Sequence, residues 1–378
     1  MLIFGIITGL VVLVALIVVH ELGHAIVARR NGVIVEEFGI GFPPRAWKKK
    51  LKNGVLFTLN WLPLGGFVRL KGENDAAKEK GTYGAATFWQ KTKILLAGVV
   101  MNWLVAVVLL TALAWVGLPK IVPNQFAVPA DTRIETSHVT LGSIVAGSAA
   151  ERAQFQSGDI IRAVDETSVD ATQDFIAMTR ERAGSEVVIT YEREGVSSTA
   201  QVTLGEDTEK GVFGASIGQR ETIHASWSAP IVGVVTTGQL TWETLSGLGG
   251  MLVKLATGTV QQFSGNDETR EAAKDKLDEV SNSVAGPVGI LGVIFPSAQD
   301  QGFGQIILLT AVISLTLAVM NALPIPALDG GRWWTMTVFR LLKKKLTKER
   351  EETIQGIGFL VLVGLIILIT ISDVSKLW

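Results

Sequence analysis

Long uncharged apolar runs constrain the fold of this chain more than any other feature of its sequence. The first run covers residues 2–19 and is long enough to cross a lipid bilayer as a helix. Three more cover about 94–118, 306–323 and 357–371. Only 18% of the residues are charged, against about 25% in a typical soluble domain. The pattern predicts an α-helical membrane protein with four transmembrane helices.

The connections between these runs predict an orientation in the membrane. Basic residues are dense after the first run and before the last one, and the positive-inside rule places both segments in the cytoplasm. Both chain termini and the long segment of about 120–304 then lie outside the cytoplasm. The formal net charge is −1 and no basic stripe carries stacking aromatic residues, so we expect no nucleic-acid partner.

The long segment between the second and third runs contains a different kind of sequence. Residues 126–205 alternate short apolar runs with turns, which predicts one compact α+β domain. We therefore expect four parts: 1–118 with two spans, 126–205, a linker over 206–304, and 305–378 with the last two spans. Residues 226–263 are apolar but interrupted by polar residues. We expect amphipathic helices there, on the membrane surface or against the bundle, because a fifth span would place one basic segment on the wrong side.

The motif His20-Glu21-Leu-Gly-His24 ends the first apolar run. Residues four apart on a helix share one face, so the two imidazoles can hold one zinc ion at about 2.0–2.1 Å. Zinc lowers the pKa of its water towards about 7, and Glu21 is placed to accept the proton. An ordinary pair of hydrogen-bonded core histidines is the alternative. We favour the metal because a charged group inside a span costs about 2.5–3.5 kcal/mol and requires a partner.

A third metal ligand is expected where the third run ends, in the sequence NALPIPALDGG from Asn321 to Gly331. The two prolines end the helix and the two glycines permit a tight backbone path. Non-helical backbone at membrane depth is tolerated only where protein buries it or where it lines a water-filled cavity. Asp329 is a helix N-cap in one interpretation. Beside a histidine motif that lacks a third ligand, we expect it to bind the metal.

Residues 56–70 are rich in β-forming side chains and contain a Gly-Gly pair. The pattern predicts an exposed strand edge to which an extended substrate could add as a further strand. We expect this pairing near Gly66, Phe67 and Val68. The alternative is a hairpin that only packs on the helices.

Several segments together resemble the site-2 protease family of intramembrane metalloproteases, in its bacterial branch with a PDZ domain. HELGHAIVARRNGV, residues 20–33, resembles the first-span motif of that family, and NALPIPALDGG resembles its third-ligand segment. LPLGGFVRLKGE (62–73), LLAGVVMNWLVA (95–106) and GPVGI (286–290) resemble further family segments in the same order. The resemblance covers nearly the whole chain. One PDZ-like domain is expected where the best-known enterobacterial form has two.

The resemblance implies a fold and an activity. The fold is a metalloprotease core of four transmembrane helices with a membrane-associated β-hairpin region and one inserted α+β PDZ-like domain. Zn²⁺ is the implied cofactor, with ligands His20, His24 and Asp329 and with Glu21 as general base. Asn321 and Asn102 are expected to contact the substrate, although an interhelical hydrogen bond is the alternative for each.

The implied substrates are transmembrane segments of single-span membrane proteins already trimmed on their outer side, such as anti-sigma factors or remnant signal peptides. The implied location is the bacterial inner membrane, in contact with lipid, with both termini and the PDZ-like domain outside the cytoplasm. Two other classes compete with this hypothesis. A membrane scaffold or receptor would bind partners through the PDZ-like domain and carry an inactive metal site. A transporter is disfavoured because the sequence has four spans and no repeated halves.

Overall fold

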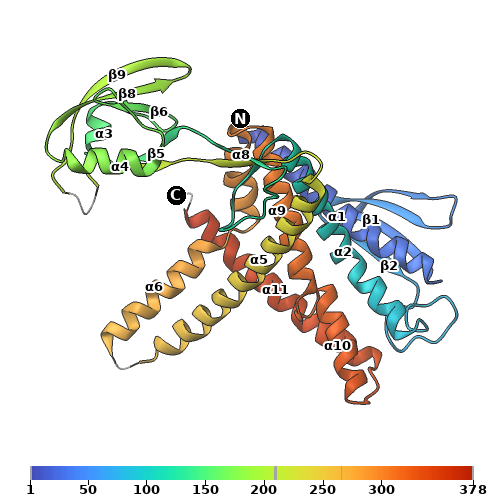
Figure 1. Cartoon of the computed structure of the whole chain (residues 1–378). Coiled ribbons are helices and arrows are strands. Elements are labelled where there is room, and N and C mark those ends of the chain that lie inside the picture. Colours follow the sequence, from blue (N-terminus) through green and yellow to red (C-terminus); the bar gives the residue numbers. More distant parts are fainter. Residues whose placement is uncertain (1, 208–210, 265, 377–378) are drawn as a thin grey trace. The chain divides into compact units, whose positions relative to one another are not determined.

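The computed structural model describes residues 2–207, 211–264 and 266–376 (Figure 1). Residues 1, 208–210, 265 and 377–378, which fall in the expected terminal and linker parts, lie outside the described residues. The chain divides into two compact units. The helical unit comprises the chain up to Ala114 and from Ala229 onward, and the sheet unit is Trp115–Ser228.

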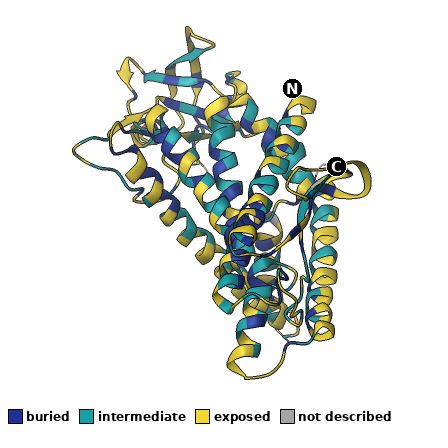
Figure 2. Cartoon of the chain, turned by 90° about the vertical axis from the view of Figure 1, so that its right-hand side faces the viewer, coloured by how far each residue is buried: buried dark blue, intermediate teal, exposed yellow. Residues whose placement is uncertain are grey.

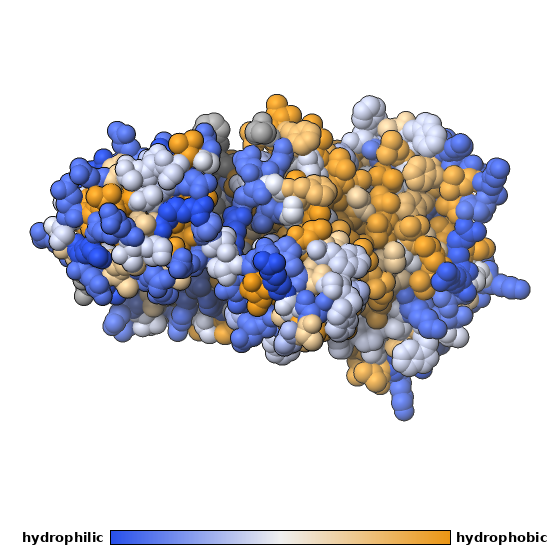
Figure 3. All heavy atoms as spheres, turned by 45° about the horizontal axis from the view of Figure 1, so that its top comes forward, coloured by the Kyte–Doolittle hydropathy of each residue, from blue (hydrophilic) through white to orange (hydrophobic). Residues whose placement is uncertain are grey.

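Four helices of the helical unit are long and apolar enough to cross a membrane. They are α1 (Leu2–Arg30), α2 (Phe88–Val116), α9 (Phe303–Ala322) and α11 (Lys348–Lys376). Each overlaps one expected apolar run and extends beyond it at one end or both, because the flanking polar residues continue the helix. Figure 3 shows hydrophobic residues gathered on the surface of the helical unit, whereas hydrophilic residues dominate the surface of the sheet unit. This surface suits a protein whose helices face lipid.

Glycines bring α1 into close contact with its neighbours. A Cβ atom at Gly23 would lie 2.8 Å from the carbonyl oxygen of Ala97, so α1 and α2 touch through their backbones. A Cβ at Gly9 would lie 2.6 Å from the ring of Phe295, the first residue of α8. The chain reaches α8 (Phe295–Asp300) through α7 (Pro287–Gly289) and a π-helix (Ile290–Ile294). Small residues let membrane helices approach closely, and Figure 2 shows buried residues where elements meet.

Between α1 and α2 the chain forms a two-stranded sheet of β1 (Val35–Lys50) and β2 (Leu56–Leu70). Both strands bend, so that the first half of β1 pairs with both ends of β2. Ile40, for example, pairs with Gly66 and with Leu59. The final segment of β2, residues 66–70, pairs with β1 on one side only. Within the described part of the chain no strand pairs with its other side, so this segment is an edge.

A broken segment joins α9 to α10 (Asp329–Leu341). Helix α9 ends at Ala322, before Pro324 would interrupt its hydrogen bonds. Ala327 adopts a φ of 78°, in the left-handed region. A Cβ at Gly331 would lie 2.0 Å from the carbonyl oxygen of Ile325, so the start of α10 passes against this segment only because the residue is glycine.

One continuous helix, α5 (Ala229–Gln261), occupies most of residues 226–263, where several amphipathic helices were expected. Its first half packs against the bundle. A Cβ at Gly233 would lie 2.8 Å from the backbone nitrogen of Thr111 on α2. The indole N–H of Trp103 on α2 donates to the hydroxyl of Thr241 at 3.2 Å. The second half of α5 packs on α6 (Asp267–Ser283).

The sheet unit is built on one antiparallel sheet in the order β10–β5–β6–β8–β9, with β7 paired to β6. The strands are β5 (Val139–Ile144), β6 (Ile160–Val164), β7 (Thr167–Ser168), β8 (Glu186–Arg193), β9 (Val196–Thr203) and β10 (Ala215–Gly218). Two short helices, α3 (Ala149–Arg152) and α4 (Thr172–Glu181), complete the fold. Phe175 of α4 is buried in one core with Ile161 and Ile189 of the sheet. Strand β10 lies beyond residue 205, where the α+β domain was expected to end. Its four residues are too few to show the alternation of apolar and polar side chains that predicts a strand.

A three-stranded sheet lies where the chain enters and leaves the sheet unit. Its order is β3 (Leu118–Pro119), β11 (Glu221–His224), β4 (Arg133–Thr136). Leu118 of β3 pairs with Ile223 of β11. The carboxylate of Asp131 accepts hydrogen bonds from the hydroxyl and backbone N–H groups of Ser226 and Ser228. These hydrogen bonds, first those of the Ser226 and Ser228 hydroxyls, lower the pKa of Asp131 to about 2.

Candidate metal centre

His20 and His24 face the same side of α1, as their four-residue spacing predicts. Their Nε2 atoms lie 3.1 Å apart. The two ring planes cross at 76°, with the ring centroids 4.8 Å apart. Exposure is 8% for His20 and 9% for His24, so both imidazoles are shielded from the surroundings. The two rings are closest to each other at their Nε2 atoms.

Asp329 supplies a third donor from a distant part of the sequence. Its Oδ2 atom lies 3.0 Å from Nε2 of His20 and 3.2 Å from Nε2 of His24. Asp329 is the first residue of α10, directly after the broken segment. The structure thus brings together the three residues that the sequence analysis predicted as metal ligands. Their possible ligand atoms all lie within 4.8 Å of one another.

The geometry of these donors fits a zinc ion. Two ligands at about 2.0–2.1 Å from a tetrahedral zinc lie about 3.3 Å apart, close to the observed separations of 3.0–3.2 Å. Nδ1 of His24 lies 2.7 Å from the carbonyl oxygen of Ile94 on α2. A carbonyl oxygen only accepts hydrogen bonds, so Nδ1 carries the hydrogen. Nε2 then has a free lone pair with which it can bind a metal ion.

Gly98 makes space for the centre on α2. A Cβ atom at this position would lie 2.5 Å from Nε2 of His20 and 2.5 Å from Nε2 of His24. Any side chain here would occupy the volume beside the donor atoms. The closeness of α1 and α2 at Gly23 creates this requirement, since the helices leave no room for a methyl group at the level of the histidines.

Glu21 lines a cavity of about 190 Å³ together with His24 and Asp329. Phe67 and Val68 of the β2 edge segment line the same cavity. A Cβ at Gly66 would lie 3.4 Å from Cγ of Glu21, so the edge segment runs directly beside the acid. The cavity therefore combines two of the candidate metal ligands, a carboxylate of the HELGH motif and a strand edge.

Arg332 ties the start of α10 to its surroundings, one helical turn after Asp329. Its guanidinium donates to Glu73 Oε1 at 2.9 Å and to Glu351 Oε1 at 3.1 Å, and it stacks over the buried Tyr83 ring, 4.6 Å from the centroid. Burial acts to lower the pKa of Arg332, but Tyr83, Glu73 and Glu351 raise it above its ordinary value. Arg332 and Glu73 both line the cavity of Glu21.

The remaining expected site residues lie in different surroundings. The amide of Asn321 donates to the carbonyl of Leu317 at 3.0 Å, within its own helix. Asn102 is 1% exposed, and its backbone carbonyl accepts from the hydroxyl of Ser314 on α9 at 2.8 Å. Neither lines the cavity that contains Glu21. Their contact with substrate stays a prediction.

Sequence reasoning missed the supporting residues Gly98, Tyr83 and Arg332. Gly98 lies in a segment quoted for its family resemblance, but its role depends on how closely α1 and α2 approach. Arg332 carried a local signal, because it lies three residues after Asp329 and therefore on the same face of a helix that begins there. No local sequence signal indicated that its partners Glu73, Tyr83 and Glu351, on distant segments, would contact it.

Apolar spanning helices that hold a buried histidine pair and a carboxylate define a membrane metalloprotease, and comparison with known proteins identifies the family. The chain belongs to Peptidase family M50, whose family model matches residues 8–365. This finding confirms the resemblance to the site-2 proteases, and with it the metalloprotease activity and the zinc cofactor that the sequence predicted.

Two curated relatives match nearly the whole chain, and a solved structure matches part of it. A Clostridium perfringens protein, provisionally named a zinc metalloprotease, is 30% identical over 371 residues, covering 98% of each chain. The regulator of sigma-W protease RasP of Bacillus subtilis is 25% identical over 456 residues, covering 99% of each chain. A solved PDZ domain of an SdrC-like protein from Listeria innocua is 25% identical, covers 22% of this chain and 93% of that one, and has a TM-score of 0.20.

Proposed function

We propose that the chain cleaves single-span membrane proteins within or beside their transmembrane helices. The observation that carries this proposal is the convergence of His20, His24 and Asp329 beside Glu21 and the free edge of β2. The RasP relative is named a regulator of sigma-W protease, which supports anti-sigma factors as one substrate class. Remnant signal peptides are the other. The proposed location is the bacterial inner membrane, with both termini and the sheet unit outside the cytoplasm.

In this proposal His20, His24 and Asp329 hold the zinc ion. Bound there, zinc polarises a water molecule and the carbonyl of the scissile bond. The hydrogen bond from His24 to Ile94 holds one imidazole in the tautomer that binds metal. Arg332 acts on Asp329 indirectly, because it fixes the first turn of α10 through Glu73 and Glu351.

Glu21 is the proposed general base. It neighbours His20 in sequence and lines the cavity with His24 and Asp329, which supports this role. In the proposed reaction it accepts a proton from the attacking water and returns it to the amide nitrogen of the leaving strand. The substrate carbon–nitrogen bond then breaks, giving a new carboxyl end that keeps the hydroxyl of the water and a new amine that carries the transferred proton.

The edge segment 66–70 is the proposed docking strand for the substrate. A transmembrane helix satisfies its backbone hydrogen bonds internally, so it must unwind before its carbonyls become accessible. Strand addition to a free edge supplies replacement hydrogen bonds for the extended segment. Phe67 and Val68 line the same cavity as Glu21, which supports docking of the substrate strand beside the proposed base. Asn321 and Asn102 are further candidates for substrate contact.

The sheet unit is proposed to control which substrates reach the centre. As a PDZ-like domain it either excludes partners whose outer domain is intact or recruits a newly formed C-terminus. The paired strands β3 and β11 allow a clean test, because Leu118 and Ile223 are neighbours. Replacing the chain between Pro119 and Thr222 with a short Gly-containing turn keeps the entry and exit strands together. Faster cleavage of untrimmed substrates by this deletion indicates a filter, and slower cleavage indicates recruitment.

The test of the activity is cleavage of a short single-span substrate, free of an outer domain, by the purified chain in detergent. We expect cleavage by the native chain, none with Glu21→Gln and none with chelator. Glu186→Gln, which makes the same change at an exposed residue of β8 in the sheet unit, should cleave normally. Zinc content should be equal in both variants. Cleavage by Glu21→Gln at the native rate would show that another group is the base.

A further inference from the structure

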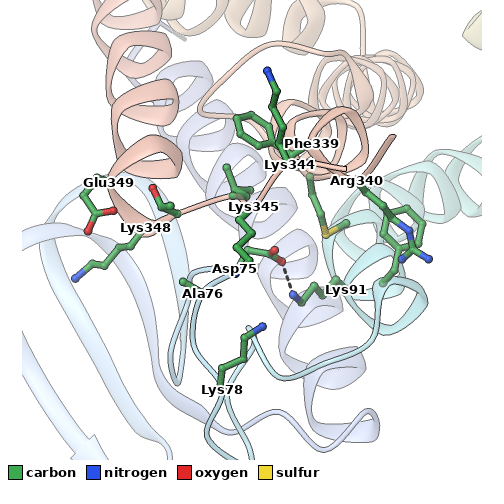
Figure 4. A pocket seen from close by; sticks show the side chains of 14 residues that line it. Asp75, Ala76, Lys78, Lys91, Phe339, Arg340, Lys344, Lys345, Lys348 and Glu349 are labelled. Atoms are coloured by element: carbon green, nitrogen blue, oxygen red, sulfur yellow. Dashed lines mark hydrogen bonds and ion pairs between the residues drawn. The ribbon is translucent and has the colours of Figure 1, made fainter. Parts of the chain in front are cut away.

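A second cavity, distinct from the metal centre, carries a strong positive charge (Figure 4). Its volume is about 580 Å³. Three segments line it: the loop at residues 75–78, the start of α2, and the stretch from the end of α10 to the start of α11. Its cationic side chains are Lys78, Lys91, Arg340, Lys344, Lys345 and Lys348. Its carboxylates are only Asp75 and Glu349, so the lining has an excess of four positive charges.

Most of these cations lack a carboxylate partner. Lys91 is buried and forms an ion pair with Asp75, the contact drawn in Figure 4. Lys348 lies 3.7 Å from Glu352. In the described part of the chain, Arg340 and the other three lysines of the cavity have no acidic group within 4.0 Å. An anion that entered the cavity would therefore meet charges that no internal pair neutralises.

The unpaired cations lie next to residues that pack on the helical unit. The guanidinium of Arg340 stacks over the ring of Phe88, 4.4 Å from the centroid. After α10 ends, Lys343 turns the chain with a φ of 54°. Leu346 is then buried, with 8% exposure. Lys344 and Lys345 lie between this turn and the buried Leu346, and both line the cavity.

An apolar surface continues from the charged lining. Phe88, Met336, Phe339 and Leu346 contribute to the cavity wall. Next to them in sequence, Trp89, Leu341 and Leu342 are exposed by 69%, 76% and 59%. Exposed leucine and tryptophan beside basic residues are typical of the boundary between headgroups and hydrocarbon. A ligand with a charged head and apolar tails matches both surfaces, whereas a soluble anion matches only the first.

We propose that this cavity binds the phosphate headgroup of an anionic phospholipid, whose acyl chains lie along the exposed apolar residues of α2 and α10. The recognised chemistry is a phosphate group close to Arg340, Lys344 and Lys345. The proposal does not depend on the proteolytic mechanism. It distinguishes a defined lipid site from the general attraction that any basic segment has for an anionic membrane, which is about fivefold per basic residue.

The experiment is native mass spectrometry of the full chain in mild detergent, titrated with phosphatidylglycerol or with phosphatidylcholine of the same acyl chains. Arg340→Gln, Lys344→Gln and Lys345→Gln are combined in one variant. The matched control combines Lys48→Gln, Lys49→Gln and Lys50→Gln, which remove three exposed charges from β1, outside the cavity lining. A single Lys345→Glu variant gives a milder second test. Melting temperatures confirm that every variant folds.

We expect one phosphatidylglycerol to be retained selectively by the native chain and by the control, and affinity to fall roughly a hundredfold in the cavity variant. Equal losses in the cavity variant and the control overturn the proposal, because the attraction is then diffuse. A third arm adds inorganic phosphate at millimolar concentration. If it displaces the lipid completely, the site is for a soluble phosphate and the lipid proposal is wrong.

Discussion

Nδ1 of His24 donates to the backbone carbonyl of Ile94, 2.7 Å away on the neighbouring helix. The hydrogen bond links the histidine motif of α1 to the backbone of α2, whose position is in turn set by glycine contacts. A backbone acceptor cannot be removed by changing the side chain of Ile94. The orientation of this imidazole is therefore determined by the packing of α1 against α2.

Replacing Gly98 with alanine should remove zinc. The new Cβ would lie 2.5 Å from Nε2 of both histidines, so the donors must separate or the helices must shift. We expect zinc affinity to fall at least about tenfold, as when the support of a ligand is lost. Zinc content after dialysis against a metal buffer measures the effect. Gly250→Ala, on α5 with open space around it, should bind zinc normally; a loss there too would mean that the assay reports general instability.

Replacing Arg332 with glutamine should destabilise the start of α10. The change leaves Glu73 and the nearly buried Glu351 without their cation, and breaking a buried pair costs about 3–5 kcal/mol. We expect a lower melting temperature and weaker zinc binding through Asp329. Arg332→Lys restores the charge but not the planar fork, so recovery should be partial. Full recovery with lysine would show that charge alone suffices.

Replacing Ala327 with glycine should stabilise the segment before Asp329. A φ of 78° is unfavourable for alanine, and relief of this strain should contribute about 1 kcal/mol. The matched control is Ala318→Gly inside α9, which should destabilise by about 1 kcal/mol because glycine weakens a helix. Thermal unfolding of both variants measures the difference. A destabilised Ala327→Gly would indicate that the side chain makes a contact that outweighs the strain.

The stability of the sheet unit should fall below about pH 4. The pKa of Asp131 is lowered to about 2 in the folded chain, against about 3.9 in an unfolded one. The stabilisation is therefore complete above the unfolded pKa and is lost as the pH falls towards 2. Hydrogen exchange of residues 221–228, corrected for the intrinsic pH dependence, should accelerate across this window. Asp131→Asn should flatten the change, and an unchanged profile would contradict the assignment.

Local sequence signals were sufficient to predict that the histidine pair and Asp329 lie close together. The spacing of His20 and His24 fixes their common face, and the prolines before Asp329 fix the helix break. Gly98 and Glu73 could not be predicted, because their roles depend on the approach of helices and loops far apart in sequence. The single helix α5 was not predicted either. Its polar interruptions favoured several amphipathic helices, whereas the structure has one helix, in which Gly233 packs on α2 and Gly258 packs on Leu277 of α6.

The strand pair β3–β11 brings the two ends of the sheet unit together, so that the unit forms an insertion in the chain. Leu118 and Ile223 are hydrogen-bonded neighbours, so about a hundred residues are inserted at what is geometrically a single point of the chain. Duplication, loss or replacement of the inserted domain then leaves the catalytic scaffold unbroken. Under the proposed function, exchange of the domain at this junction should change the choice of substrate without altering the residues that cleave the peptide bond.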